Sequence, residues 1–270
     1  MDSTFYKQLE DDAKQWVTEA GSILVSHEHD FTVAKQKDEV DVSTSADTEV
    51  EQFLTKRILE KYPDHAIYGE EFGLTKKNAA YVWSIDPLDN TKEYVRGIGE
   101  YNCLLAVEEN GILVAGIVQR FGPAVCYTTS KGNGALLDGK PIRVSTTSNL
   151  NVAFIGTNTA NNKVHTADEI DRFCNLSKEV ISDAYRIRPG ADDAKLFGWV
   201  AQGAFDASIS LPKSNKWFDV APAILLVEEA GGKVTDWLGN PIQGHDLSKG
   251  ILVSNSVLHE TLLPIVKKFI

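Results

Sequence analysis

The chain has 270 residues, of which 43% are hydrophobic and 24% are charged. This length can bury a core of useful size, and the composition is that of an ordinary globular protein, which excludes a disordered chain and a bundle of membrane spans. Its 27 Lys and Arg against 38 Asp and Glu give a formal net charge of −11 at pH 7. Such a charge repels phosphate backbones and anionic lipid headgroups, so we expect no nucleic acid and no membrane as partners.

The first half of the chain predicts two helices packed on an antiparallel sheet. Apolar residues recur at three- and four-residue steps over residues 4–27 and 47–62, the spacing of amphipathic helices. The polar segment 35–47 that overlaps the second helix start predicts a hairpin or loop. After Pro63, short apolar runs separated by turn residues predict strands at 66–69, 81–85, 102–107, 112–119, 125–129 and 134–139.

The second half alternates between strand and helix patterns. Strands are predicted at 152–158, 184–189, 205–211, 233–237 and 250–255, and helices at 167–181, 193–203, 220–230 and 259–269. This alternation is typical of a mostly parallel layered lobe. We therefore expect an α+β chain of two lobes, residues 1–148 and 149–270, that share an interface because no Pro-, Gly- or Ser-rich linker separates them.

Cysteine usage and the start of the chain bear on the compartment. Cys103, Cys126 and Cys174 are an odd number without paired spacing, and their apolar surroundings predict buried free thiols. The sequence begins with acidic residues and no apolar signal-like region follows. Both observations favour a cytoplasmic protein.

The segment WSIDPLDNTKEY carries the most informative pattern. Asp86 and Asp89 bracket a predicted turn directly after a strand, which brings two carboxylates close together. Two like charges at this distance need a cation or a shared proton, and oxygen-only ligands suit Mg²⁺ before Mn²⁺ or Ca²⁺. Asn90 and Thr91 then open a helix or turn whose N–H groups can bind an anion. Together these features can hold a phosphoryl group, although a solvated, capped turn is the structural alternative.

At this point the chain resembles the inositol monophosphatase superfamily, Mg²⁺-dependent and lithium-sensitive phosphatases whose central motif is Asp-Pro-(Ile/Leu)-Asp-Gly-Thr. The resemblance extends over most of the chain, to VDVSTSAD, YGEEFG and KWFDVAPAILLVEEAGG, in family order at residues 40–47, 68–73 and 216–232. It implies a layered α-β-α-β-α sandwich and a phosphoric monoester hydrolase. It also implies a homodimer, and a C-terminal lobe that supplies part of the metal site and the substrate pocket.

The resemblance implies a site of two or three Mg²⁺ ions with these ligands. Glu70, Asp86 and the carbonyl of Leu88 would hold the first ion. Asp86, Asp89 and Asp219 would hold the second, and Glu70 would help to hold a third. Each of these acids has a structural alternative when taken alone, since Asp219 could cap a helix and Glu70 could be a surface acid.

The implied catalytic residues are Asp47, Thr91 and Glu70. On the family pattern Asp47 orients the Thr91 hydroxyl, which accepts a proton from a metal-bound water, and the N–H groups of Asn90 and Thr91 bind the phosphate. No side chain becomes covalently phosphorylated. The structural alternative for Asp47 is the cap of the helix over residues 47–62.

Two departures from the family pattern affect this site. Asn90 stands where the family has glycine; if that position requires a positive φ, Asn is the least costly replacement. The family Trp-Asp pair is stretched to Trp217-Phe218-Asp219, and we choose Asp219 as the ligand over the nearby Asp206.

The signals for substrate conflict. Asp192 or Asp193 would favour hydrogen bonds to the hydroxyls of a polyol, whereas Lys92 or Lys213 would favour a second phosphate. The stretch Thr91–Tyr94 is similar to the Thr-Lys-Glu-Phe of the adenosine bisphosphate nucleotidase branch. We expect an inositol-phosphate-like substrate, with Asp192 and Lys92 among its contacts. The alternatives are 3′(2′),5′-bisphosphate nucleotidase, then histidinol-phosphatase, or a non-catalytic protein that binds a phosphorylated ligand.

Overall fold

The chain forms two compact units, Met1–Gly139 (unit 1) and Lys140–Ile270 (unit 2), and each is described by itself. The structure is a computed structural model that describes residues 3–28, 30–36, 42–76, 78–190, 192–242 and 244–270. The division falls earlier in the chain than residue 148. One physical reason is that the N–H of Val144 donates to the Ala230 carbonyl at 3.2 Å, which ties this irregular segment to unit 2.

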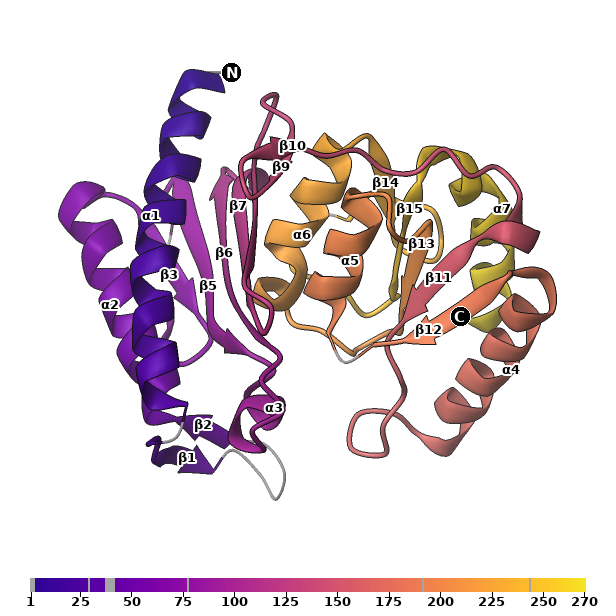
Figure 1. Ribbon diagram of the computed structural model, residues 1–270, viewed down its shortest axis with the longest axis horizontal. Helices are drawn as coiled ribbons and strands as arrows, with labels where there is room; N and C mark the ends of the chain where they lie inside the picture. Colours follow the sequence, from indigo (N-terminus) through magenta and orange to yellow (C-terminus); the bar gives the residue numbers. More distant parts are fainter. Residues whose placement is uncertain (1–2, 29, 37–41, 77, 191, 243) are drawn as a thin grey trace. The chain divides into compact units, whose positions relative to one another are not determined.

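Unit 1 packs two long helices on one face of a sheet (Figure 1). Its elements are α1 (Ser3–His27), β1 (Val33–Gln36), β2 (Val42–Thr44), α2 (Ser45–Lys61), β3 (Ala66–Gly69), β4 (Gly73–Leu74), β5 (Tyr81–Asp89), α3 (Thr91–Val95), β6 (Tyr101–Glu109), β7 (Ile112–Phe121), β8 (Val125–Ser130) and β9 (Ala135–Leu137). Both predicted long helices are confirmed. Strands β1 and β2 pair antiparallel, as expected for a hairpin, and the connecting residues 37–41 lie outside the described residues.

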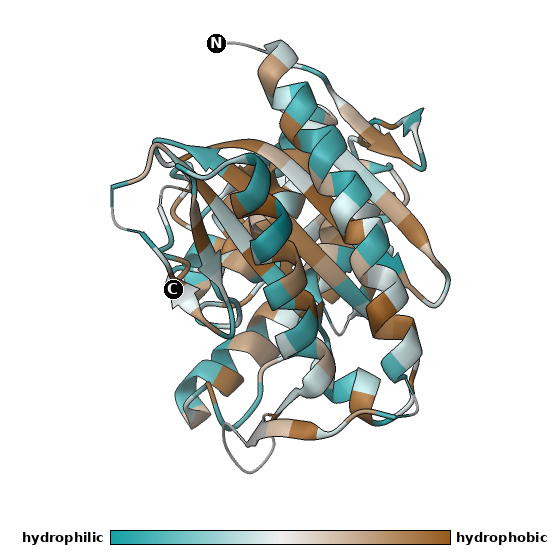
Figure 2. Ribbon diagram, turned by 90° about the vertical axis from the view of Figure 1, so that its left-hand side faces the viewer, coloured by the Kyte–Doolittle hydropathy of each residue, from teal (hydrophilic) through white to brown (hydrophobic). Residues whose placement is uncertain are grey.

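The sheet of unit 1 runs in the order β9-β8-β7-β6-β5-β3-β4. The sequence predicted an antiparallel sheet. In the structure β3 and β5 pair in parallel, and the other pairs are antiparallel. Its core lies under α1 and α2 and includes Leu9, Trp16, Leu54 and Trp83. In Figure 2 the helix that begins at the N-terminus carries alternating hydrophobic and hydrophilic bands, the pattern of a helix with one buried face.

Strand β5 extends further than the sequence predicts. The segment around Asp86 and Asp89 was expected to form a turn, but β5 continues to Asp89. It can do so because the pairing with β6 shifts register there: Asp86 lies opposite Leu104 and Asp89 opposite Asn102, so β5 has one extra residue. A β-bulge of this kind bends the strand and accommodates a proline, which cannot donate to the ladder.

Unit 2 has helices on both faces of a five-stranded sheet, with α5 and α6 on one face and α4 and α7 on the other (Figure 1). Its elements are β10 (Lys140–Pro141), the 3₁₀ helix η1 (Leu150–Val152), β11 (Phe154–Thr157), α4 (Ala167–Asp183), β12 (Arg186–Pro189), α5 (Asp193–Ala201), β13 (Ala207–Ser210), α6 (Trp217–Glu229), β14 (Gly232–Thr235), β15 (Ile251–Asn255), α7 (Ser256–Val266) and the 3₁₀ helix η2 (Lys267–Phe269).

The strand order of unit 2 is β12-β11-β13-β15-β14. The expected parallel arrangement holds for β12, β11 and β13, whereas β15 pairs antiparallel with both β13 and β14. The reason is the connection from β14 to β15, which has no helix among its described residues, 236–242 and 244–250, and returns the chain in the opposite direction. The sheet is therefore mixed, and β15 is inserted between β13 and β14.

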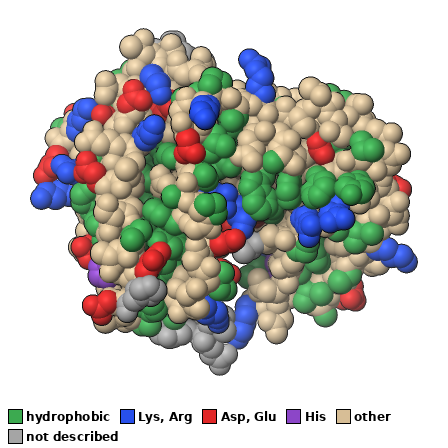
Figure 3. Space-filling view, viewed as in Figure 1, with side chains coloured by type: hydrophobic (Ala, Val, Ile, Leu, Met, Phe, Trp, Pro, Cys, Tyr) green, Lys and Arg blue, Asp and Glu red, His purple; other side chains and the backbone are tan. Residues whose placement is uncertain are grey.

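Surface features complete the description. Of the three cysteines, Cys103 is buried as predicted, Cys126 is half-buried, and Cys174 is exposed because it lies on the outer side of α4. Over the face drawn in Figure 3, Lys and Arg side chains are interspersed with Asp, Glu and hydrophobic side chains. Within the described residues, no helix is long and apolar enough to cross a membrane.

Candidate functional site

The parallel pairing of β3 and β5 places two predicted ligands beside each other in unit 1. Gly69 lies opposite Ile85, and the N–H of Glu70 donates to the Ile85 carbonyl at 3.1 Å. Glu70 therefore follows the end of β3 directly alongside Asp86 on β5. Asp86 is only 2% exposed, and its Oδ1 accepts a hydrogen bond from the Leu88 N–H at 3.1 Å.

The bulge in β5 orients the next two predicted ligands. Leu88 is buried, and its carbonyl accepts a hydrogen bond from the Thr91 hydroxyl at 2.8 Å. The Oδ2 atom of Asp89 accepts a hydrogen bond from the side-chain amide of Asn102 at 2.6 Å. Asn102 is buried on β6 and was missed in the sequence, where nothing marks it as a partner of Asp89. It fixes the orientation of this carboxylate by occupying one of its oxygens.

Asn90 has the left-handed conformation that the family glycine suggests, with φ 67° and ψ 42°. Asn tolerates this conformation better than other residues with a β-carbon, so the turn from β5 into α3 is retained. Its carbonyl accepts the N–H groups of Glu93 and Tyr94, each at 3.0 Å. Lys92, a predicted substrate contact, is exposed on this short helix.

The predicted catalytic pair meets in the structure. Asp47 lies in the first turn of α2, and its Oδ1 accepts a hydrogen bond from the Thr91 hydroxyl at 3.3 Å. Its Oδ2 accepts from the N–H and the hydroxyl of Thr44, so Asp47 is also part of the capping box of α2. The cap does not use the whole carboxylate, because one oxygen caps the helix and the other reaches Thr91.

Burial perturbs the acid of this pair. Asp47 is 1% exposed, and its removal from water raises the pKa of the carboxyl from 3.8 to about 6, while the hydrogen bonds from Thr44 oppose the rise. A carboxylate with a pKa in this range can accept a proton near neutral pH and release it again.

A second buried acid, Glu51, supports the loop that carries Glu70. Its carboxylate accepts the N–H groups of Glu71 and Phe72 at 2.8 and 3.1 Å. It also lies so close to Gly69 that a β-carbon there would come within 1.8 Å of Oε1, which explains the glycine. Sequence reasoning missed Glu51, although its position four residues after Asp47 and next to the apolar Val50 was a usable signal.

In unit 2, Asp219 lies in the first turn of α6. Its Oδ2 accepts a hydrogen bond from the Lys216 N–H at 2.7 Å, so it contributes to the cap of this helix. The alternative ligand, Asp206, is 7% exposed and its two oxygens accept from the Ser145 hydroxyl and the Phe154 N–H at 2.6 and 2.7 Å. These bonds give Asp206 a structural role and favour the choice of Asp219.

The two acids before α5 have different environments. Asp192 is the N-cap of α5, and its Oδ1 accepts from the Lys195 N–H. Asp193 is 4% exposed, and its oxygens accept three hydrogen bonds from Ser210, Asn158 and Asn215. Burial raises the pKa of Asp193 to about 6. The Asp193 carboxylate thus has three protein donors, and both of its oxygens accept from them.

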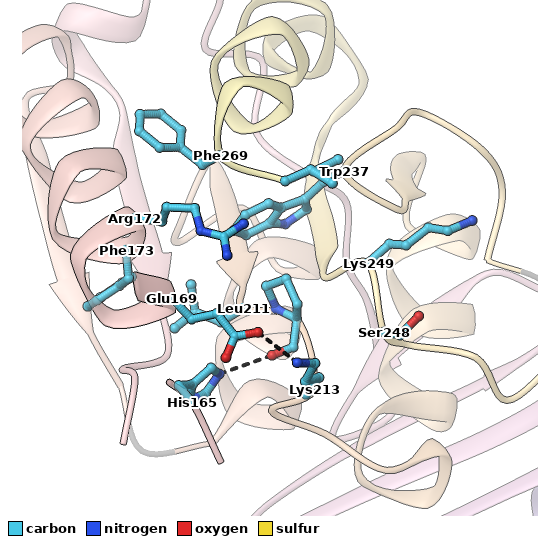
Figure 4. Close-up of a pocket in the computed structure, with 12 residues that line it drawn as sticks. His165, Glu169, Arg172, Phe173, Leu211, Lys213, Trp237, Ser248, Lys249 and Phe269 are labelled. Carbon is cyan, nitrogen blue, oxygen red and sulfur yellow. Dashed lines mark hydrogen bonds and ion pairs between the residues drawn. The ribbon is translucent and has the colours of Figure 1, made fainter. Parts of the chain in front are cut away.

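A cavity of about 140 Å³ lies in unit 2 between α4, the segment after β13 and the C-terminal turn (Figure 4). Its walls combine the aromatic rings of Phe173, Trp237 and Phe269 with charged groups. Within it, Lys213 and Glu169 form an ion pair at 2.7 Å. This pair accounts for Lys213, which the sequence had offered as a contact for a second phosphate.

The donor set of unit 1 fits Mg²⁺. Glu70, Asp86, Asp89 and the Leu88 carbonyl provide only oxygen, which is the ligand type that Mg²⁺ prefers. In the described part of the chain no three His, Cys, Asp or Glu side chains form a preassembled metal cluster. Mg²⁺ does not require one, since it is usually bound by one or two carboxylates together with water and the phosphate of the substrate.

Comparisons with known proteins identify the family and the fold of this chain. A model of the inositol monophosphatase family matches residues 6–270. The Nus factor SuhB of Pseudomonas aeruginosa is 32% identical over 245 residues, which cover 88% of this chain and 87% of the relative. A histidinol-phosphatase of Chlorobaculum parvum is 27% identical over 256 residues, 93% of each chain.

Among solved structures, the extragenic suppressor protein suhB of Bartonella henselae has a TM-score of 0.86 and 25% identity, covering 97% of this chain and 100% of that chain. This likeness confirms the fold class predicted from the sequence.

Proposed function

Because this chain belongs to the inositol monophosphatase family of phosphatases, we propose that it hydrolyses a small-molecule phosphate monoester with Mg²⁺ as its cofactor and water as the nucleophile. The substrate we propose first is an inositol phosphate. The ligands would be Glu70, Asp86, the Leu88 carbonyl and Asp89 of unit 1, with Asp219 of unit 2 completing the set for two or three ions.

The observation that carries the proposal is the hydrogen bond between Asp47 and Thr91. These residues are far apart in the sequence, and the fold brings a buried carboxylate with a raised pKa to a hydroxyl at the end of residues 86–91, which we call the acidic segment. The single proton of the Thr91 hydroxyl can be donated to the Leu88 carbonyl at 2.8 Å or to Asp47 at 3.3 Å, and in the second arrangement it can pass to the carboxylate. The Thr91 hydroxyl and the Asp47 carboxylate can therefore act together as a general base.

The residues of the chain divide the work of the reaction. Bound Mg²⁺ would supply a more acidic water and neutralise charge on the phosphate. Thr91 accepts the proton of the attacking water and passes its own proton to Asp47. The N–H groups of Asn90 and Thr91 lie at the start of α3, where N–H groups without a partner in the helix can bind an anion. In this scheme they bind the phosphate oxygens. Asn102 and Glu51 hold the acidic side chains and the Glu70 loop in place.

The acidic net charge is compatible with an anionic substrate on this scheme. The proposed ligands Glu70, Asp86, Asp89 and Asp219 are four of the 38 acids, and two or three divalent cations would reverse the sign of the local field. Activity should therefore depend on the metal. Lithium sensitivity, a property of the family pattern, is a further expectation.

Phosphate release tests the proposal. The chain is incubated with inositol 1-phosphate, adenosine 3′,5′-bisphosphate and histidinol phosphate, each with Mg²⁺, with EDTA, and with Mg²⁺ plus Li⁺. We expect turnover with Mg²⁺, loss of turnover with EDTA, inhibition by Li⁺, and the highest kcat/KM for inositol 1-phosphate. Faster hydrolysis of one of the other two substrates would replace our substrate assignment with that alternative. No hydrolysis of any monoester would favour a non-catalytic binder of a phosphorylated ligand.

We also propose partners and a location for the chain. The name Nus factor belongs to a relative, and the charge of −11 on this chain argues against direct binding of nucleic acid. A gel shift with RNA at low salt checks this expectation. We also propose a cytoplasmic homodimer, which light scattering on the purified chain and fractionation of cells would test.

A further inference from the structure

The segment between β13 and α6 leads to the proposed ligand Asp219. We call residues 211–216 the α6 entry loop. It has no regular structure of its own, and its last residue, Lys216, is the N-cap of α6. The N–H of Lys216 donates to Oδ2 of Asp219 at 2.7 Å, so the end of the loop and this carboxylate are joined directly. The position of the loop therefore affects the orientation of Asp219.

A buried polar network holds the inner side of this loop. Asp193, the first residue of α5, accepts from the Asn215 side-chain amide through Oδ2 at 2.7 Å. The same oxygen accepts from Asn158 at 2.7 Å, and Oδ1 accepts from the Ser210 hydroxyl at 2.6 Å. Asn158 in turn accepts the N–H of Leu211 at 2.9 Å, at the start of the loop. The network thus secures both ends of the α6 entry loop.

The outer side of the loop is held less firmly. The ring of His165 is hydrogen-bonded to the Pro212 carbonyl at 3.0 Å. Glu169 and Lys213, which Figure 4 shows side by side, form an ion pair at 2.7 Å. The side chain of Lys213 is 53% exposed, so its ion pair contributes little in water. Asp193, by contrast, is buried, and a charge-assisted hydrogen bond is stronger away from solvent.

Burying a carboxylate costs desolvation free energy that an apolar side chain at the same position would not cost. Burial raises the pKa of Asp193 although its three donors oppose the rise, so the hydrogen bonds do not fully replace the water that the carboxylate has lost. Its one bond to the loop is the one to Asn215, the residue before the N-cap of α6. Asp193 also follows Asp192, the N-cap of α5 and a predicted substrate contact.

We propose that Asp193 is a positioning residue that fixes the start of α6, and with it the Asp219 carboxylate, through Asn215. The metal-binding role of Asp219 rests on the proposed function, whereas the fixing of the loop does not. Asp193 does not touch the substrate. Through this residue, the orientation of the Asp219 carboxylate depends on the position of the start of α5, next to Asp192.

Two variants that each remove one hydrogen bond from the same carboxylate test this inference. Asn215→Ala removes the bond to the loop, and Ser210→Ala removes a bond that does not reach the loop. Hydrogen exchange of the Lys216 amide in EDTA reports the loop without any metal. We expect exchange to be roughly 10-fold faster in Asn215→Ala and changed less than about 2-fold in Ser210→Ala, because only the first variant frees the loop.

Metal binding is measured on the same proteins with Mn²⁺ as the probe, by electron paramagnetic resonance. We expect Asn215→Ala to bind one Mn²⁺ about 10-fold more weakly, with kcat largely restored at saturating metal, and Ser210→Ala to match the unmodified chain. Equal effects of the two variants on exchange would overturn the positioning role and leave a general contribution to stability. If the unmodified chain binds no Mn²⁺, the proposed function fails, and the exchange result alone decides the inference.

Discussion

Asp47 of unit 1 and Asp193 of unit 2 are two buried acids with the same perturbation and different connections. Burial raises the pKa of each from 3.8 to about 6. Asp47 keeps one oxygen directed to Thr91, a residue of the acidic segment, while its other oxygen caps α2. Both oxygens of Asp193 accept hydrogen bonds from protein donors.

The comparison shows that a perturbed pKa marks a candidate without assigning its role. What separates the two acids is whether an oxygen faces a group that can take part in the chemistry. By this criterion Asp47 is a catalytic candidate and Asp193 is a positioning residue. The variants below would break or sharpen this distinction, and the acid that we place on the metal gives the largest expected effect.

Asp89→Asn should remove turnover, to below about 1% of the unmodified chain, because an amide is a poor ligand for Mg²⁺ and cannot replace the lost charge. The Asn102 amide can still donate to the remaining oxygen, so the fold should be retained. In EDTA the melting temperature should be equal or slightly higher, since one of several neighbouring negative charges is removed. Phosphate release and thermal denaturation measure the two effects.

The matched control is Asp64→Asn, which removes an exposed acid of unit 1. It should leave both quantities unchanged. Substantial activity in Asp89→Asn would contradict the metal assignment.

Asp47→Asn should lower kcat by about 100-fold with little change in KM, because the amide cannot accept the proton that Thr91 passes on. Thr44→Ala is the control that separates catalysis from capping. It removes the side-chain part of the α2 cap, which costs about 1 kcal/mol of stability, and leaves the contact from Thr91 to Oδ1 intact. A similar loss of kcat in the two variants would mean that Asp47 acts only as a cap.

The pH dependence of stability compares the two acids directly. A carboxyl whose pKa is higher in the folded state stabilises the fold when protonated. Its contribution is full below its unfolded pKa of 3.8 and is lost as the pH rises through about 6. Buried His259, with a pKa lowered to about 4, acts in the opposite direction, so each acid must be isolated by a variant.

We therefore compare the melting temperatures of the unmodified chain and of Asp193→Asn in EDTA. The unmodified chain should gain a few degrees relative to the variant when the pH is lowered from 7.5 to 5. The same difference against Asp47→Asn should have the same sign. The range stops at pH 5 because Glu169, whose pKa is lowered to about 2, loses its stabilising effect below its unfolded pKa of 4.5. A difference that stays constant would mean that the acid is not perturbed.

Much of the fold could be predicted because amphipathic periodicity is a local property. The helix spacing over residues 4–27 and 47–62 corresponds to α1 and α2. Strand direction is not local: an apolar run looks the same whether its neighbour is parallel or antiparallel. For this reason the parallel β3–β5 pair and the antiparallel β15 were not foreseen.

The site divides in the same way. Asp86, Asp89 and Thr91 could be proposed as site residues because they share one short motif. Glu51 and Asn102 could not be assigned as their supports, because each acts through a contact between segments far apart in the sequence. Asp192 and Asp193 show most clearly what the sequence cannot predict. They are adjacent acids at the start of one helix and look equivalent in the sequence, but their side chains lie in different surroundings.

Asn90→Gly should have the smallest effect. Asn90 already has φ 67°, so glycine can adopt the same conformation and the N–H groups at the start of α3 should stay in place. The greater freedom of the unfolded chain should lower stability by about 0.5 kcal/mol. Removing the side chain from beside the acidic segment should keep activity within about 2-fold or raise it. A loss of 10-fold or more in kcat/KM, with an unchanged melting curve, would show instead that the Asn90 side chain itself contacts the substrate, and the phosphate site would then include more than backbone N–H groups.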